Sequence, residues 1–119
     1  MKRNNTIQDK SLAFAIRIVN LYKYLIADKR EYVLSKQLLR SGTGIGANVE
    51  EAIGGVSDKD FLNRLEIAYK EARESTYRLK LLNKTDYLTD TEFESLFKDA
   101  EEICKILGKI QITTKIRNS

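Results

Sequence analysis

The sequence contains no proline, tryptophan or histidine, and it has a single cysteine, Cys104. Without proline, long helices need not be interrupted. Without histidine, the chain cannot form a Cys–His or Ser–His catalytic pair or the Glu-x-x-His metal site of helical bundles. One cysteine cannot form an internal disulfide. We therefore expect no catalytic, cofactor or metal site, and a protein that is not an enzyme.

Long apolar runs are also missing. No stretch of about 18 apolar residues is present, and the segment from Met1 to Thr6 lacks the apolar core of a signal peptide. These absences predict a cytoplasmic protein with no membrane segment. The 119 residues are enough for one domain, residues 1–119, near the size at which subunit contacts often add stability.

Glycines are concentrated in the most unusual part of the chain, residues 37–53. At 100° per residue, five apolar side chains fall on one narrow arc, which predicts a helix: Leu34, Leu38, Ile45, Val49 and Ala52. Three glycines inside it oppose this, since each costs about 1 kcal/mol relative to alanine. Close packing against another helix can offset that cost. The residues that we expect to allow it are Gly42, Gly44, Gly46 and Ala47.

The alternative is that Ser41–Gly44 is a loop between two short helices, because Gly and Ser clusters usually mark loops. The apolar stripe argues against it. A loop would normally shift the phase of the stripe, which instead continues across the glycines.

Polar residues flank the glycine segment. A cation and an anion, Arg40 and Glu51, lie on either side of the small residues, and Asn48 lies near the edge of the apolar stripe. If partly buried, such groups need partners. Glu71 and Glu74 in the following helix are candidates for pairing with Arg40. We interpret Arg40, Asn48, Glu51 and Glu71 as an interhelical network that fixes register and needs no ligand.

The remaining pattern predicts four helices with short connections. The first begins near Thr6 or Asp9 and ends near Ala27, and the second covers residues 31–53 and stops at Gly54-Gly55 with a left-handed glycine. The third follows the Ser57 cap for some 26 residues. The fourth follows the Thr89/Glu92 capping box to Ile112, and a frayed tail follows. The fold class is therefore all-α, an antiparallel up-down-up-down four-helix bundle.

The first helix carries two apolar stripes, one from Leu12 to Ile26 and one from Phe14 to Leu25. A surface helix of a monomer usually carries one. We expect part of this apolar surface to contact another subunit.

Charge is unevenly distributed. Residues 1–48 hold nine basic residues (Lys and Arg) and three acidic ones (Asp and Glu). Residues 49–104 hold eight basic and fourteen acidic residues, and residues 105–119 hold four basic residues and no acidic one. Either these regions neutralise each other, or the ends form a basic surface that binds phosphate. The tyrosines offer stacking platforms. Candidate phosphate contacts are Lys2, Arg3, Lys10, Arg17, Lys36, Lys109, Lys115 and Arg117.

The segment from Leu38 to Ser41 and from Ile45 to Ala52, followed by Ser57, Asp60-Phe61, Leu65, Ala68 and Glu71, resembles a known family. Its members are small four-helix-bundle proteins encoded in intervening sequences of bacterial large-subunit ribosomal RNA genes. The chain is similar also to accessory variability proteins of diversity-generating retroelements. The resemblance implies a ring-like homo-oligomer, commonly a pentamer. In the retroelement proteins, basic barrels bind nucleic acid and a reverse transcriptase.

The usual family pattern has a glycine soon after the Asn-x-x-Glu element, whereas Ala52 follows here and the glycines come at Gly54-Gly55. Our hypothesis is a non-enzymatic homo-oligomer that binds RNA or a ribonucleoprotein through a basic surface. The alternative is a structural or protein-interaction scaffold whose charges pair internally and which has no nucleic-acid role.

Overall fold

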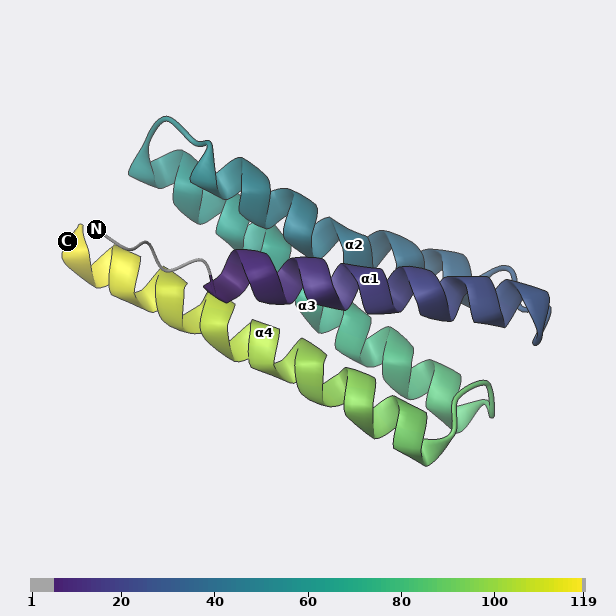
Figure 1. The fold of residues 1–119 in the computed structure, drawn as a ribbon. Coiled ribbons are helices and arrows are strands. Elements are labelled where there is room, and N and C mark those ends of the chain that lie inside the picture. Colours follow the sequence, from purple (N-terminus) through teal and green to yellow (C-terminus); the bar gives the residue numbers. More distant parts are fainter. Residues whose placement is uncertain (1–5, 119) are drawn as a thin grey trace.

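The computed structural model describes residues 6–118 and places four α-helices there: α1 (Thr6–Ala27), α2 (Leu34–Ile53), α3 (Asp58–Lys84) and α4 (Asp90–Arg117). Within the described residues, contacts between helices run α1–α2, α2–α3, α3–α4 and α4–α1. The connections α1–α2 and α3–α4 lie at one end, and the connection α2–α3 lies at the other (Figure 1). The predicted all-α, up-down-up-down four-helix bundle is confirmed.

The glycine segment is one continuous helix, so the alternative of a loop at Ser41–Gly44 is wrong. Its start was also misplaced, because α2 begins at Leu34 and not at Glu31. Glu31 acts before the helix instead. Its carboxylate accepts hydrogen bonds from the backbone N–H groups of Val33, Leu34 and Ser35, at 3.2, 2.9 and 2.6 Å. These N–H groups have no partner within the helix, so Glu31 satisfies the start of α2.

Two predicted caps are present. The Ser57 hydroxyl accepts from the backbone N–H of Asp60 at 3.1 Å, and Thr89 with Glu92 forms a reciprocal capping box. The predicted left-handed glycine after α2 is wrong, because Gly54 has φ −81°. Left-handed residues occur instead at Arg30, with φ 55°, and Asp86, with φ 70°.

The predicted frayed tail after Ile112 is also wrong, because α4 continues to Arg117. Thr114 is only 3% exposed, and its hydroxyl donates to the carbonyl of Ile110 at 2.8 Å. Packing of this side chain outweighs the weak helix propensity of the threonine pair at 113–114.

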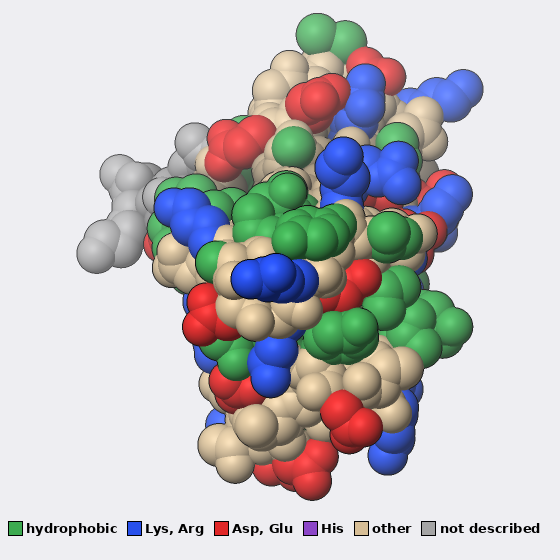
Figure 2. All heavy atoms as spheres, turned by 90° about the vertical axis from the view of Figure 1, so that its right-hand side faces the viewer, with side chains coloured by type: hydrophobic (Ala, Val, Ile, Leu, Met, Phe, Trp, Pro, Cys, Tyr) green, Lys and Arg blue, Asp and Glu red, His purple; other side chains and the backbone are tan. Residues whose placement is uncertain are grey.

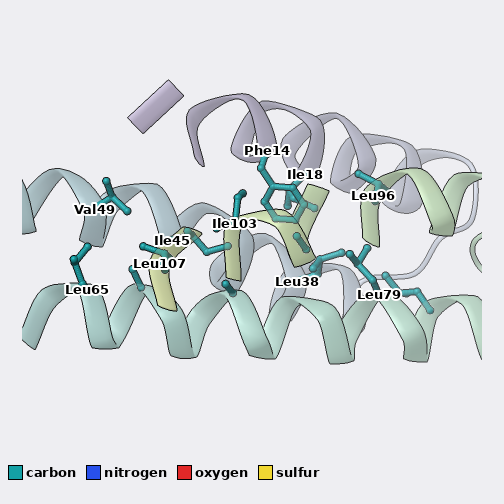
Figure 3. Packing of buried hydrophobic residues seen from close by; sticks show 14 of the residues in the cluster. Phe14, Ile18, Leu38, Ile45, Val49, Leu65, Leu79, Leu96, Ile103 and Leu107 are labelled. Carbon is teal, nitrogen blue, oxygen red and sulfur yellow. The ribbon is translucent and has the colours of Figure 1, made fainter. Parts of the chain in front are cut away.

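The core is a single seam of aliphatic side chains and one phenylalanine along the bundle axis (Figure 3). On α1, Phe14, Ile18 and Leu25 are 1% exposed or less, so the stripe that contains them faces the core. On α3 the small residues Ala68 and Ala72 are fully buried between leucines, which lets neighbouring helices approach closely. No described helix combines the length and hydropathy that crossing a bilayer requires.

Candidate functional site

The glycines of α2 face two different helices. A Cβ atom built on Gly42 would lie 2.9 Å from both Cγ atoms of Ile18 in α1, which is closer than real Cβ contacts allow. A Cβ on Gly46 would lie 3.5 Å from the Ser11 hydroxyl oxygen, an ordinary contact. Gly44 faces the Glu71 carboxylate of α3. Gly42 therefore sets the approach of α1, and the predicted small-residue strip is divided between two interfaces.

Ala47 lies in an open groove between α1 and α2. The groove has a volume of about 380 Å³, and its lining includes the small residues Ser11, Gly46 and Ala47 together with Asp9 and Glu50. Leu12 stands at its rim and is 62% exposed, and Ile16, one turn further on, is 54% exposed. The N-terminal part of the stripe from Leu12 to Ile26 is therefore accessible on the bundle surface, next to a hollow lined in part by small residues.

Arg40 forms no ion pair with a described residue, although its charge acts on Glu71, which also has an acidic neighbour. Burial, a hydrogen bond with the Glu74 carboxyl and repulsion from its charge raise the pKa of Glu71. The guanidinium groups of Arg40 and Arg78 act in the opposite direction and do not outweigh these causes. Glu71 and Glu74 thus form a carboxyl pair next to Gly44, on the side of α2 that faces α3.

The other two residues of the expected network have separate partners. Asn48 donates its side-chain amide to the carbonyl of Gly44, four residues earlier in the same helix, at 2.9 Å. Glu51 forms an ion pair with Arg64 of α3 at 3.1 Å, and both side chains are about half exposed. The four residues therefore divide into separate contacts along α2 and do not share one buried cluster.

Two of the proposed phosphate contacts are engaged within the bundle. Lys10 forms an ion pair with Glu102 at 3.1 Å, and Arg17 forms one with Asp99 at 2.6 Å. The Arg17 guanidinium also donates to the hydroxyl of Ser95 at 2.9 Å. All of these acceptors are on α4. Lys10 and Arg17 thus connect α1 to α4, as the scaffold alternative expects.

The other candidates remain accessible. Lys36 in the first turn of α2, and Lys109, Lys115 and Arg117 near the end of α4, are exposed and form no ion pair with a described residue. Lys115 lies beside a hollow that also contains Asp58 and Glu66. The remaining two candidates, Lys2 and Arg3, lie outside the described residues.

A profile of the 23S rRNA-intervening sequence protein family matches residues 3–109. The chain belongs to that family. A crystal structure of a protein of unknown function from the S23 ribosomal protein family of Bacteroides thetaiotaomicron VPI-5482 is 53% identical in sequence. The match covers 90% of this chain and 96% of that one, with a TM-score of 0.89. A search of curated proteins finds no match.

In this member of the 23S rRNA-intervening sequence protein family, no group of three or more Cys, Asp or Glu within residues 6–118 is placed to hold a metal ion. Cys104 is partly buried on α4. Burial raises the pKa of its thiol, and the nearby Glu101 carboxylate acts in the same direction against the opposing effect of Arg73. A protonated thiol is a poor nucleophile and metal ligand, so Cys104 has the properties of a packing residue.

Sequence reasoning overlooked the cations around the connection between α1 and α2. Three exposed cations here were not among the candidate phosphate contacts: Lys23, Lys29 and Arg30. Like the candidate Lys36, they form no ion pair with a described residue. The two adjacent cations Lys29 and Arg30 in a short connection could have indicated a basic surface. The next residue, Glu31, could have neutralised them, and only the structure shows that its carboxylate instead caps α2.

Proposed function

We propose that this protein is a subunit of a non-enzymatic homo-oligomer, with a pentameric ring as the expected form, and that the assembly binds RNA or a ribonucleoprotein. The observation that carries the assembly is the exposed Leu12–Ile16 stripe beside the α1–α2 groove. An exposed apolar ridge next to a hollow of small residues gives one copy a surface for another. The two surfaces differ, which suits the head-to-tail contacts of a ring.

The RNA role has two supports. The described part of the chain presents exposed Lys and Arg side chains that form no ion pair within it, and such side chains bind phosphate in a salt-dependent manner. The solved relative is assigned to a ribosomal protein family. A cytoplasmic location is part of the same proposal.

Sedimentation velocity at micromolar concentration tests the assembly. We expect the unaltered protein to sediment as an oligomer, and Leu12→Glu with Ile16→Glu to sediment as a folded monomer, because charge would be buried at the contact. Ala47→Glu in the neighbouring groove should have the same effect. Val56→Glu is the control, since Val56 is 92% exposed in the connection between α2 and α3. A monomeric unaltered protein would contradict the assembly.

Fluorescence anisotropy with a mixed-sequence, single-stranded 20-nucleotide RNA tests the RNA role. Affinity should fall as salt rises from 50 to 200 mM, with a log–log slope of about −0.7 for each phosphate contacted. If no binding occurs at 50 mM salt, the RNA role is refuted.

The second candidate function is a protein-interaction scaffold without RNA. The ion pairs Lys10–Glu102 and Arg17–Asp99 favour it, because they use cations of α1 to neutralise acids of α4. An oligomer that forms normally and binds no RNA at low salt would support this alternative.

A further inference from the structure

The connection between α1 and α2 has a fixed shape. The backbone N–H of Asp28 donates to the carbonyl of Tyr24 at 2.8 Å, and that of Glu31 donates to Leu25 at 3.0 Å. Arg30 between them takes a left-handed conformation, with φ 55°. The Glu31 carboxylate then holds the first three N–H groups that follow Tyr32. Side chains on this connection are therefore presented by a well-anchored backbone.

The same contacts leave the outer surface of the connection with an excess of positive charge. Glu31 is 9% exposed, and its carboxylate oxygens are occupied by backbone N–H groups. Asp28 is the one exposed acid between residues 23 and 36. Four exposed cations lie in the same stretch of the chain, and none forms an ion pair with a described residue: Lys23, Lys29, Arg30 and Lys36.

The same stretch of the chain carries an exposed aromatic ring. Tyr32 is 60% exposed and its neighbour Val33 is 65% exposed. Figure 2 views the bundle from the end that holds the α1–α2 and α3–α4 connections, where hydrophobic side chains lie next to Lys and Arg, with Asp and Glu also present on this face. An exposed ring flanked by unpaired cations is the arrangement with which proteins bind single-stranded nucleic acid, because bases stack on the ring while cations contact phosphates.

We propose that the α1–α2 end, formed by Lys23, Lys29, Arg30, Tyr32 and Lys36, is the surface that binds single-stranded RNA. This inference rests on the proposed function and assigns its binding site. The competing basic surface, near the end of α4, is less suited to this ligand. Its exposed apolar residues, Ile112 and Ile116, are aliphatic, and Asp58 and Glu66 lie in the same hollow as Lys115.

Two matched variants test the site with the 20-nucleotide RNA at 50 mM salt. The first, Lys23→Gln, Lys29→Gln, Arg30→Asn and Lys36→Gln, removes the four cations, with Asn chosen because it tolerates the left-handed conformation. The second removes four cations from α4: Lys105→Gln, Lys109→Gln, Lys115→Gln and Arg117→Gln. Both lower the net charge by four, so a general effect of charge would be equal in the two. Circular dichroism and sedimentation check that each folds and assembles.

We expect the first variant to bind at least 30-fold more weakly than the unaltered protein, with a shallower salt dependence, and the second to lose less than threefold. Tyr32→Ala should bind about tenfold more weakly and Tyr32→Phe normally, since stacking needs the ring and not the hydroxyl. Tyr77→Ala is the control, because Tyr77 on α3 is 62% exposed.

These measurements distinguish failure of the site assignment from failure of the RNA role. If the unaltered protein binds RNA and the α4 variant loses more affinity than the α1–α2 variant, the site assignment is overturned and the RNA role stands. If Tyr32→Ala binds normally and double-stranded RNA or heparin competes as well as single-stranded RNA, the surface is a general polyanion site and the proposal is refuted. If no RNA binds at all, both fail.

Discussion

The two sides of α1 are held by different kinds of contact. Against α2, the missing side chain of Gly42 lets Ile18 approach the backbone, and Gly46 admits Ser11. Against α4, the partly exposed ion pairs of Lys10 and Arg17 join the helices. A hollow of about 330 Å³ remains between α1 and α4 near Tyr24. A closely packed contact is disrupted by small changes in side-chain volume, whereas an exposed ion pair contributes little to stability. We therefore expect substitutions on the α2 side to lower the free energy of unfolding more than those on the α4 side.

The largest effect is expected for Gly42→Val. Its Cβ alone would lie 2.9 Å from two side-chain atoms of Ile18, which is 1% exposed. Overpacking of this kind typically costs about 1–3 kcal/mol of unfolding free energy. Urea unfolding followed by circular dichroism measures the loss. Gly108→Val on α4 is the control, because the nearest atom to its Cβ, on Tyr69, would be 3.9 Å away. Equal losses would contradict a close approach at Gly42.

A gain of stability is expected for Gly46→Ala. The added Cβ would make ordinary contacts with Ser11, the nearest at 3.5 Å, while alanine favours the helix by about 1 kcal/mol over glycine. The gain should be somewhat below that value, and urea unfolding again measures it. A loss would mean that α1 approaches α2 at Gly46 as closely as at Gly42.

These two glycines mark the limit of prediction from sequence. The phase of the stripe from Leu34 to Ala52 was enough to predict a continuous α2, and the capping patterns at Ser57 and Thr89 located two helix starts. The pattern could not predict which side chain of α1 packs against each glycine, because spacing along one helix does not specify the register of the helices around it.

The candidate site was less predictable for the same reason. The seven-residue spacing of Lys10 and Arg17 placed both on one polar face of α1, but their partners Glu102 and Asp99 are over 80 residues away. The α1–α2 end is a candidate RNA-binding surface only because the Glu31 carboxylate caps α2 and does not pair with the nearby cations. Even α4 was underestimated, because burial of Thr114 depends on tertiary packing.

The α2–α3 interface combines close approach with charge and should respond to pH. Because burial and Glu74 raise the pKa of Glu71 above its ordinary value of 4.5, the protonated form is favoured in the fold. This contribution to stability is present below pH 4.5 and is lost as pH rises through the pKa in the folded protein. Glu71→Gln should therefore gain stability relative to the unaltered protein as pH increases from 4 to 7. The exposed Glu66→Gln is the control, and a pH-independent difference would contradict the carboxyl pair.

The smallest effect is expected at the α1–α4 side. Arg17 and Asp99 are each about two-fifths exposed, so water and salt weaken their attraction even at 2.6 Å. A double-mutant cycle with Arg17→Ala and Asp99→Ala should give a coupling energy of about 0.5 kcal/mol or less, falling further in 0.5 M salt. The cycle is needed because Arg17→Ala also removes the hydrogen bond from Arg17 to Ser95, a loss that the coupling energy subtracts. A coupling above 2 kcal/mol that salt does not reduce would mean that the pair is covered, for example by a second copy of the chain, and that the two sides of α1 are equally constrained in the assembly.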